Sequence, residues 1–219
     1  MAWPQKPPDI RGNETTVGLA TPTGMIHGDV HGGNFMFGSV LNHQEHEISP
    51  VLHLIDFGQS ELWGATVEHS TGATAEQYNV LDMGIMMATV ITMNTDSKYG
   101  AADIEVDLSK LGRPIDTLCP AAGILPDPEA RPIIDPCPHV DPDLRLVVAA
   151  CMADEPQNRP TLAELENWVF SEVCNTYPAH YFRNPGGADY ENDSTIQKMV
   201  QMCIFNAESG GDFFPRAVL

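Results

Sequence analysis

Residues 27–34 read H-G-D-V-H-G-G-N, and residues 54–58 read L-I-D-F-G. Two short apolar segments follow the first stretch, at 35–37 and 51–55, with a polar stretch between them, and the second runs into L-I-D-F-G. That pattern is typical of a β-hairpin with a long loop. The sequence therefore predicts that Asp29 and Asn34 on one side, and Asp56 on the other, flank a single hairpin.

These three side chains are the candidate chemistry of the chain. Phosphoryl transfer needs a carboxylate that accepts the proton of the attacking hydroxyl, and it needs oxygen ligands for Mg²⁺. Stabilisation of charge is most of the catalysis in such a reaction. Asp29, Asn34 and Asp56 together supply this set of groups.

The two motifs resemble those of the protein kinase-like superfamily. Residues 27–34 match the H-x-D-x-x-x-x-N catalytic loop, and residues 56–58 match D-F-G. The resemblance implies that ATP and Mg²⁺ are the cofactors and that Asp29 is the catalytic base. It also implies that Asn34 and Asp56 are the Mg²⁺ ligands, with Phe57 and Gly58 completing the cofactor-binding motif.

Two further landmarks follow in the order found in that family. L-D-M-G at 81–84 resembles the D-x-W-x-x-G start of the central kinase helix, which implies that Asp82 ties down the catalytic-loop backbone. N-R-P-T at 158–161 resembles the late R-P-T motif, which implies that Arg159 is the one buried arginine, with Glu68 or Glu76 as its partner. The resemblance covers roughly residues 25–172.

The catalytic loop also departs from the protein kinases. His27 is implied to pack on Phe57, as in the family, but His31 stands where most protein kinases have a lysine. H-G-D-x-H-x-x-N also resembles the loop of aminoglycoside and choline kinases, so the acceptor stays open between a protein Ser/Thr hydroxyl, which we favour, and a small molecule. Gly28 replaces the arginine that clamps a phosphorylated loop, which argues against control of that kind.

The expected fold class is α+β and mainly α: a kinase-like C-terminal lobe with a small β-hairpin. Residues 79–93 are apolar on nearly all faces and predict a central buried helix, although their β-branched residues leave a strand as the alternative. Asp141 before Pro142 predicts a second helix start. Thr161 with Glu164 predicts a third, through a capping box.

The chain divides into an irregular lead-in at 1–24, the kinase-like lobe at 25–175 and a C-terminal extension at 176–219 with one weak helix near 194–206. The proline-rich stretch 100–140 is expected to be an ordered but irregular connection. The residues before His27 contain no glycine-rich loop, strand lysine or partner helix, so the N-terminal lobe is largely absent. We expect weak or no catalysis from this chain alone, and a protein partner could supply the missing lobe.

Charge excludes some partners. The chain has 11 Lys and Arg against 30 Asp and Glu, a net charge of −19, which argues against nucleic acid and anionic membranes as partners. Between Arg11 and Lys98 there is no Lys or Arg, so a phosphate bound there needs a metal or a partner. Five widely spaced cysteines and the lack of a signal peptide predict a cytoplasmic or nuclear protein that is not secreted.

Three alternatives stay open. Residues 28–32, G-D-V-H-G, also resemble the first motif of the serine/threonine phosphatases, although the later motifs of that family do not follow. Gly-Asp and Gly-Gly-Asn are also ordinary turn sequences. The third alternative is a non-catalytic pseudokinase fragment that binds a partner through its acidic surface. The missing N-terminal lobe favours this third reading, whereas the presence of all three metal-site groups favours the enzyme.

Overall fold

The computed structural model describes residues 23–38, 50–64, 72–94, 102–175 and 192–205. The chain forms two compact units: one takes in residues up to Asn34 and from Asp56 to Cys174, and the other takes in Phe35 to Ile55 and the residues from Asn175 on. The class is mixed α+β, with about 47% helix and small two-stranded antiparallel sheets. Most of the expected lead-in and C-terminal extension lies outside the described residues.

The central element of the first unit is helix α1 (Ala75–Thr92), so the strand alternative for this segment was wrong. The helix begins before the expected residue 79 because Thr74 and Gln77 form a capping box. Gln77 donates its backbone N–H to Thr74 Oγ1 at 3.3 Å, and Thr74 donates its own to Gln77 Oε1 at 2.8 Å. Met93 ends the helix in the left-handed conformation.

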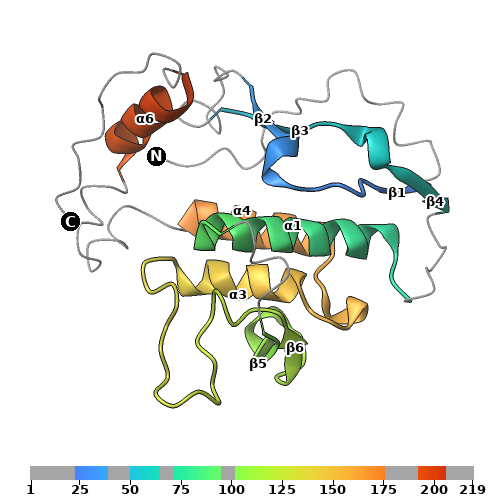
Figure 1. Cartoon of the computed structure of the whole chain (residues 1–219), viewed down its shortest axis with the longest axis vertical. Helices are drawn as coiled ribbons and strands as arrows, with labels where there is room; N and C mark the ends of the chain where they lie inside the picture. Colours follow the sequence, from blue (N-terminus) through green and yellow to red (C-terminus); the bar gives the residue numbers. More distant parts are fainter. Residues whose placement is uncertain (1–22, 39–49, 65–71, 95–101, 176–191, 206–219) are drawn as a thin grey trace. The chain divides into compact units, whose positions relative to one another are not determined.

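Helix α3 (Pro142–Cys151) packs against α1, as Figure 1 shows. Its start at Asp141 was predicted correctly, since Asp141 Oδ1 accepts the backbone N–H of Leu144 at 3.0 Å. The two helices approach so closely at Gly84 that a Cβ there would lie 2.8 Å from Cys151 Cβ. Glycine at this position therefore allows the helix contact.

A short hairpin of β5 (Ile104–Val106) and β6 (Thr117–Cys119) completes this core. The strands lie within the stretch expected to be irregular, and three residues are too few to show a period of two in the sequence. Leu108 and Cys119 have no exposed surface. The hairpin thus adds part of the main apolar cluster, whose buried members are Ala88, Ile104, Val106, Leu108, Cys119, Ala121, Ile124, Val148, Ala149, Ala150, Met152 and Ala153.

A second antiparallel pair joins segments that the sequence did not link. Strand β1 (Thr23–Ile26) pairs with β4 (Glu61–Gly64), with Ile26 opposite Glu61. The strand pair lies along α1 in Figure 1, and β1 contacts that helix. Because β1 runs directly into His27 and β4 begins directly after Ser60, this pairing brings the two motif segments together.

Helix α4 (Leu162–Asn175) starts where predicted. Glu164 donates its backbone N–H to Thr161 Oγ1 at 3.2 Å, and Thr161 donates its own to Glu164 Oε2 at 2.8 Å, so the predicted capping box is confirmed. Arg113 adds an ion pair to the same carboxylate at 2.6 Å.

The second unit contains the hairpin predicted between the motifs. Strand β2 (Phe35–Phe37) pairs antiparallel with β3 (Leu52–Leu54), with Met36 opposite His53. The weak helix expected near 194–206 is present as α6 (Asp193–Val200) followed by a π-helical turn, η8 (Gln201–Phe205). None of the helices in the described ranges is long and apolar enough to cross a membrane.

Candidate active site

The loop at residues 27–34 begins at a buried histidine. His27 is 3% exposed, and its backbone N–H donates to the side-chain oxygen of Asn79 on α1 at 3.0 Å. The amide of Asn79 also donates to the carbonyl of Met25 at 2.7 Å. One residue of α1 therefore fixes the end of β1 through both a donor and an acceptor.

Asp29 and Asn34 are brought together by the turn between them. The short helix η2 (Gly32–Asn34) directs the buried Asn34 side chain back to the start of the loop. Its Nδ2 donates to the Asp29 carbonyl at 2.8 Å and to Asp29 Oδ2 at 3.1 Å. Both bonds use the amide nitrogen, and Oδ1 of Asn34 accepts none of the hydrogen bonds found among the described residues.

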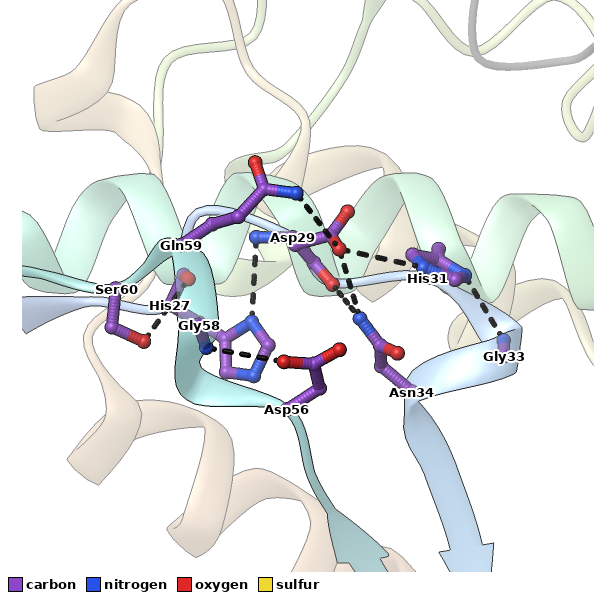
Figure 2. A network of polar contacts seen from close by, with 9 residues as sticks. All are labelled: His27, Asp29, His31, Gly33, Asn34, Asp56, Gly58, Gln59 and Ser60. Atoms are coloured by element: carbon purple, nitrogen blue, oxygen red, sulfur yellow. Dashed lines mark hydrogen bonds and ion pairs between the residues drawn. The ribbon is translucent and has the colours of Figure 1, made fainter.

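The segment after β3 is tied to residues 27–29 by three contacts, and Figure 2 shows the two that are hydrogen bonds. The Phe57 ring packs edge-on against His27, with ring centroids 4.8 Å apart. Gln59 Nε2 donates to Asp29 Oδ2 at 3.3 Å, and the Ser60 hydroxyl donates to the His27 carbonyl at 3.2 Å. The short helix η4 (Phe57–Gln59) is thereby held against residues 27–29.

Asp56 precedes these three contacts and takes an unusual backbone conformation. Its φ of 61° and ψ of 72° place it in the left-handed region, which few non-glycine residues adopt. Its Oδ1 accepts the backbone N–H of Gly58 at 3.1 Å, which makes it the cap of η4. The carboxylate is exposed, and Figure 2 shows it in the same group of side chains as Asp29 and Asn34.

The carboxylate of Asp29 is held on one side. Its Oδ2 accepts from Asn34 and Gln59 and lies 3.6 Å from Nε2 of His31. Its Oδ1 accepts none of the hydrogen bonds found within the described ranges, and the side chain is 33% exposed. The group is thus fixed in orientation while one oxygen stays accessible.

The two loop histidines share a local geometry. Nδ1 of His27 accepts the backbone N–H of Asp29 at 3.3 Å, and Nδ1 of His31 accepts that of Gly33 at 3.1 Å. On the other side of the His31 ring, Nε2 faces the Asp29 carboxylate at 3.6 Å.

Gly28 is required by the space around it. Its φ is +78°, and a Cβ built on it would lie 2.6 Å from the carbonyl oxygen of Gln59. The approach of η4 to the loop leaves no room for a side chain at position 28.

On the central helix, Asn79 makes two hydrogen bonds to the loop backbone, one turn before Asp82. The role that the resemblance implies for Asp82 stays a prediction.

Arg159 is buried, as expected, but differs from the expectation in two ways. It donates to backbone carbonyls of Ala153, Gln77 and Asp154 at 2.8, 3.2 and 3.3 Å. Burial lowers its pKa, while Tyr78, Asp154 and Asp82 act in the opposite direction. Asp82 therefore lies close enough to act on Arg159 electrostatically.

Arg159 was also expected to be the one buried arginine, with Glu68 or Glu76 as its partner. Glu76 Oε1 accepts the backbone N–H of Leu162 at 2.7 Å and so caps α4, and Glu68 lies outside the described residues. Arg159 is not the one buried arginine, because Arg145 is 4% exposed and pairs with Asp135 at 2.6 Å.

The donor set can be tested against a metal. Within the described ranges no three His, Cys, Asp or Glu side chains form a cluster that could hold a metal ion. The candidate site instead offers the carboxylates of Asp29 and Asp56 with Oδ1 of Asn34. All are oxygen donors, and Mg²⁺ is commonly bound by one or two carboxylates together with water and substrate phosphates. The donor atoms of these residues are thus of the kind that Mg²⁺ prefers.

Sequence reasoning missed Asn79, Gln59 and Ser60. Gln59 and Ser60 directly follow residues 56–58, and nothing in the sequence indicated their contacts. Comparison of the chain with protein-family models, curated proteins and solved structures finds no significant match.

Proposed function

We propose that this chain carries the acceptor-side half of a kinase-like site, which transfers a phosphoryl group from ATP to a hydroxyl. The acceptor that we favour is a protein Ser/Thr, and the alternative is a small molecule. The observation that carries the proposal is the way in which the Asp29 carboxylate is held. One carboxylate oxygen is held by Asn34 and Gln59, and the other is left to meet a substrate.

Asp29 is suited to act as the general base. A base must lie within hydrogen-bond reach of the proton that it takes, in a fixed orientation. The two amide donors on Oδ2 supply the orientation. In this proposal Oδ1 accepts the hydroxyl proton, and the N–H of His31 orients the acceptor or the carboxylate.

Asp56 and Oδ1 of Asn34 would hold Mg²⁺. When bound, the ion supplies positive charge that offsets the charge of the phosphates during transfer. The proposed roles of Phe57 and Gly58 are to set the position of Asp56: Phe57 packs on His27, and Gly58 donates to the Asp56 carboxylate. Contacts made by Phe57 and Gly58, the two residues after Asp56, thereby support its left-handed backbone conformation.

A partner would supply the rest of the nucleotide site. Between Arg11 and Lys98 the sequence has no Lys or Arg to meet the phosphates, so the negative charges of ATP would face Asp29 and Asp56. A second domain or protein with lysine or arginine would reduce that repulsion. The same feature favours the second candidate function, a binding module without catalysis, and one experiment separates the two.

The experiment is calorimetric titration of ATP into the purified chain with and without Mg²⁺. The variants are Asp56→Asn and, as the matched control, Asp29→Asn. Asparagine tolerates the left-handed backbone and keeps an acceptor for Gly58, so Asp56→Asn removes charge with little change in structure. We expect Mg²⁺-dependent binding that weakens about tenfold or more in Asp56→Asn and persists in Asp29→Asn.

The other outcomes decide against the proposal. Binding that is independent of Mg²⁺, or equal in the wild type and Asp56→Asn, would contradict the metal role. A folded chain that binds no Mg·ATP would leave the binding module as the better description. Where binding is found, phosphotransfer to a mixed peptide and aminoglycoside panel, lost in Asp29→Asn, would test the base.

A further inference from the structure

A pocket in the first unit lies apart from the candidate active site. It has a volume of about 380 Å³ and is bounded by the short helix η5 (Ser109–Leu111) and by helices α3 and α4. No residue of 27–34 or 56–60 lines it. The lining residues are Lys110, Leu111, Arg113, Val147, Ala150, Pro160, Glu164, Leu165, Asn167 and Trp168.

The inner wall of the pocket is apolar. Val147 is buried in a small core cluster, and Leu111, Leu165 and Trp168 pack against that cluster. Leu165 and Trp168 are three residues apart on α4, so they share one face of the helix. A volume of a few hundred Å³ with mostly apolar walls is typical of sites for small molecules.

The rim of the pocket is polar and fixed in place. Arg113 donates from Nη2 to Glu164 at 2.6 Å and from Nε to the carbonyl of Asn158 at 3.2 Å. Glu164 is in turn held by the capping box at Thr161. The guanidinium is therefore anchored by two of its nitrogens, while its Nη1 makes none of the hydrogen bonds found within the described ranges.

The rim also carries a small excess of positive charge. Lys110 and Arg113 outnumber Glu164 among the lining residues, in a chain whose net charge is −19. The Lys110 side chain is 74% exposed, and its only described ion pair is with Asp143 at 3.2 Å. An exposed pair of this kind is weak and exchanges readily with another anion.

We propose that this pocket binds a small organic carboxylate with an apolar body. The carboxylate lies at the rim between Lys110 and Nη1 of Arg113, where it receives charge-assisted hydrogen bonds. The apolar body lies against Val147, Leu165 and Trp168. This site is independent of the proposed phosphotransfer, since none of its residues takes part in that reaction.

Trp168 provides the readout. The chain has three tryptophans, so the full-length variant Trp3→Phe/Trp63→Phe leaves Trp168 as the fluorophore. The probes are octanoate, octanol and octylammonium at low ionic strength, each below the concentration at which it forms micelles. We expect saturable change in Trp168 emission with octanoate, and affinity about tenfold lower for octanol, because the alcohol lacks the charge-assisted bonds.

Lys110→Gln tests the rim, and Lys198→Gln on α6 removes the same charge from an exposed position that does not line the pocket. We expect Lys110→Gln to weaken octanoate binding about fivefold, Lys110→Arg to restore it, and Lys198→Gln to leave it unchanged. The proposal is overturned if octanol or octylammonium binds as well as octanoate, if both Gln variants behave alike, or if Trp168 does not respond in the folded chain.

Discussion

The side-chain oxygen of Asn79 accepts the backbone N–H of His27 at 3.0 Å, across 52 residues of sequence. This bond joins α1 to His27, the first residue of the loop at 27–34, which is almost fully buried. Its loss would remove a hydrogen bond from a buried backbone N–H. The position of the loop therefore depends on a helix residue that carries no charge.

Asn79→Ala should lower the free energy of unfolding by about 1–3 kcal/mol, because two backbone groups lose their partner. Asn79→Asp should cost less, since it keeps the acceptor for His27 and loses the donor to Met25. Urea denaturation measures both, with the exposed Asn167→Ala as the control. Equal stability of Asn79→Ala and the control would show that the bond contributes nothing.

Gly28→Ala should destabilise the chain by about 2 kcal/mol or more. The new Cβ would face the carbonyl oxygen of Gln59 at 2.6 Å, in a backbone conformation that disfavours side chains. Gly32→Ala is the matched variant four residues on, where a Cβ meets nothing within 4 Å. We expect that change to stay within about 0.5 kcal/mol in the same denaturation experiment. Similar losses in both variants would refute the steric account.

Glu164 should make stability depend on pH in the acid range. The backbone N–H of Thr161, and after it the Arg113 guanidinium, lower the pKa of Glu164 from 4.5 to about 2. A pKa that is lowered in the folded state stabilises the fold above the unfolded value, and the contribution is lost as pH falls from 4.5 toward 2. The half-exposed side chain keeps the effect below about 1 kcal/mol.

The measurement for Glu164 is thermal unfolding of the wild type and Glu164→Gln across that pH range. The difference between them should shrink as pH falls, whereas the exposed Glu166→Gln should show no such trend. A difference that stays constant down to the lowest pH would rule out the ion pair and cap as its source.

The buried cysteines should resist alkylation in the native state. Burial raises the pKa of Cys119 and of Cys151 to about 12, so neither forms the reactive thiolate near neutral pH. Cys203 is exposed and should react with iodoacetamide first. Peptide mass spectrometry before and after denaturation checks this order. Labelling of Cys119 as fast as Cys203 in folded protein would contradict the packing of the core.

Local signals in the sequence were sufficient for several elements. The caps at Asp141 and Thr161 depend on side chains within three residues of the helix start, so they could be predicted without knowledge of the rest of the fold. The pairing of β2 with β3 could be predicted for a similar reason, since the two strands follow one another in the chain. The contact between Asp29 and Asn34 is also local.

Other features depend on contacts between distant segments. Strands β1 and β4 have four residues each, only two of them apolar, and nothing in either sequence indicates which segment it pairs with. Gln59 meets Asp29 only because that pairing exists. Arg159 could be predicted to be buried, but its use of backbone carbonyls could not, since those oxygens carry no sequence signal.

The close approach of Gln59 to Gly28 also limits which substitutions position 28 can accept. A side chain there is blocked by a backbone oxygen and not by a side chain that could be exchanged. The turn at residues 56–60 would have to change shape before position 28 could accept a larger residue. The order in which substitutions can occur at these two places is thus constrained.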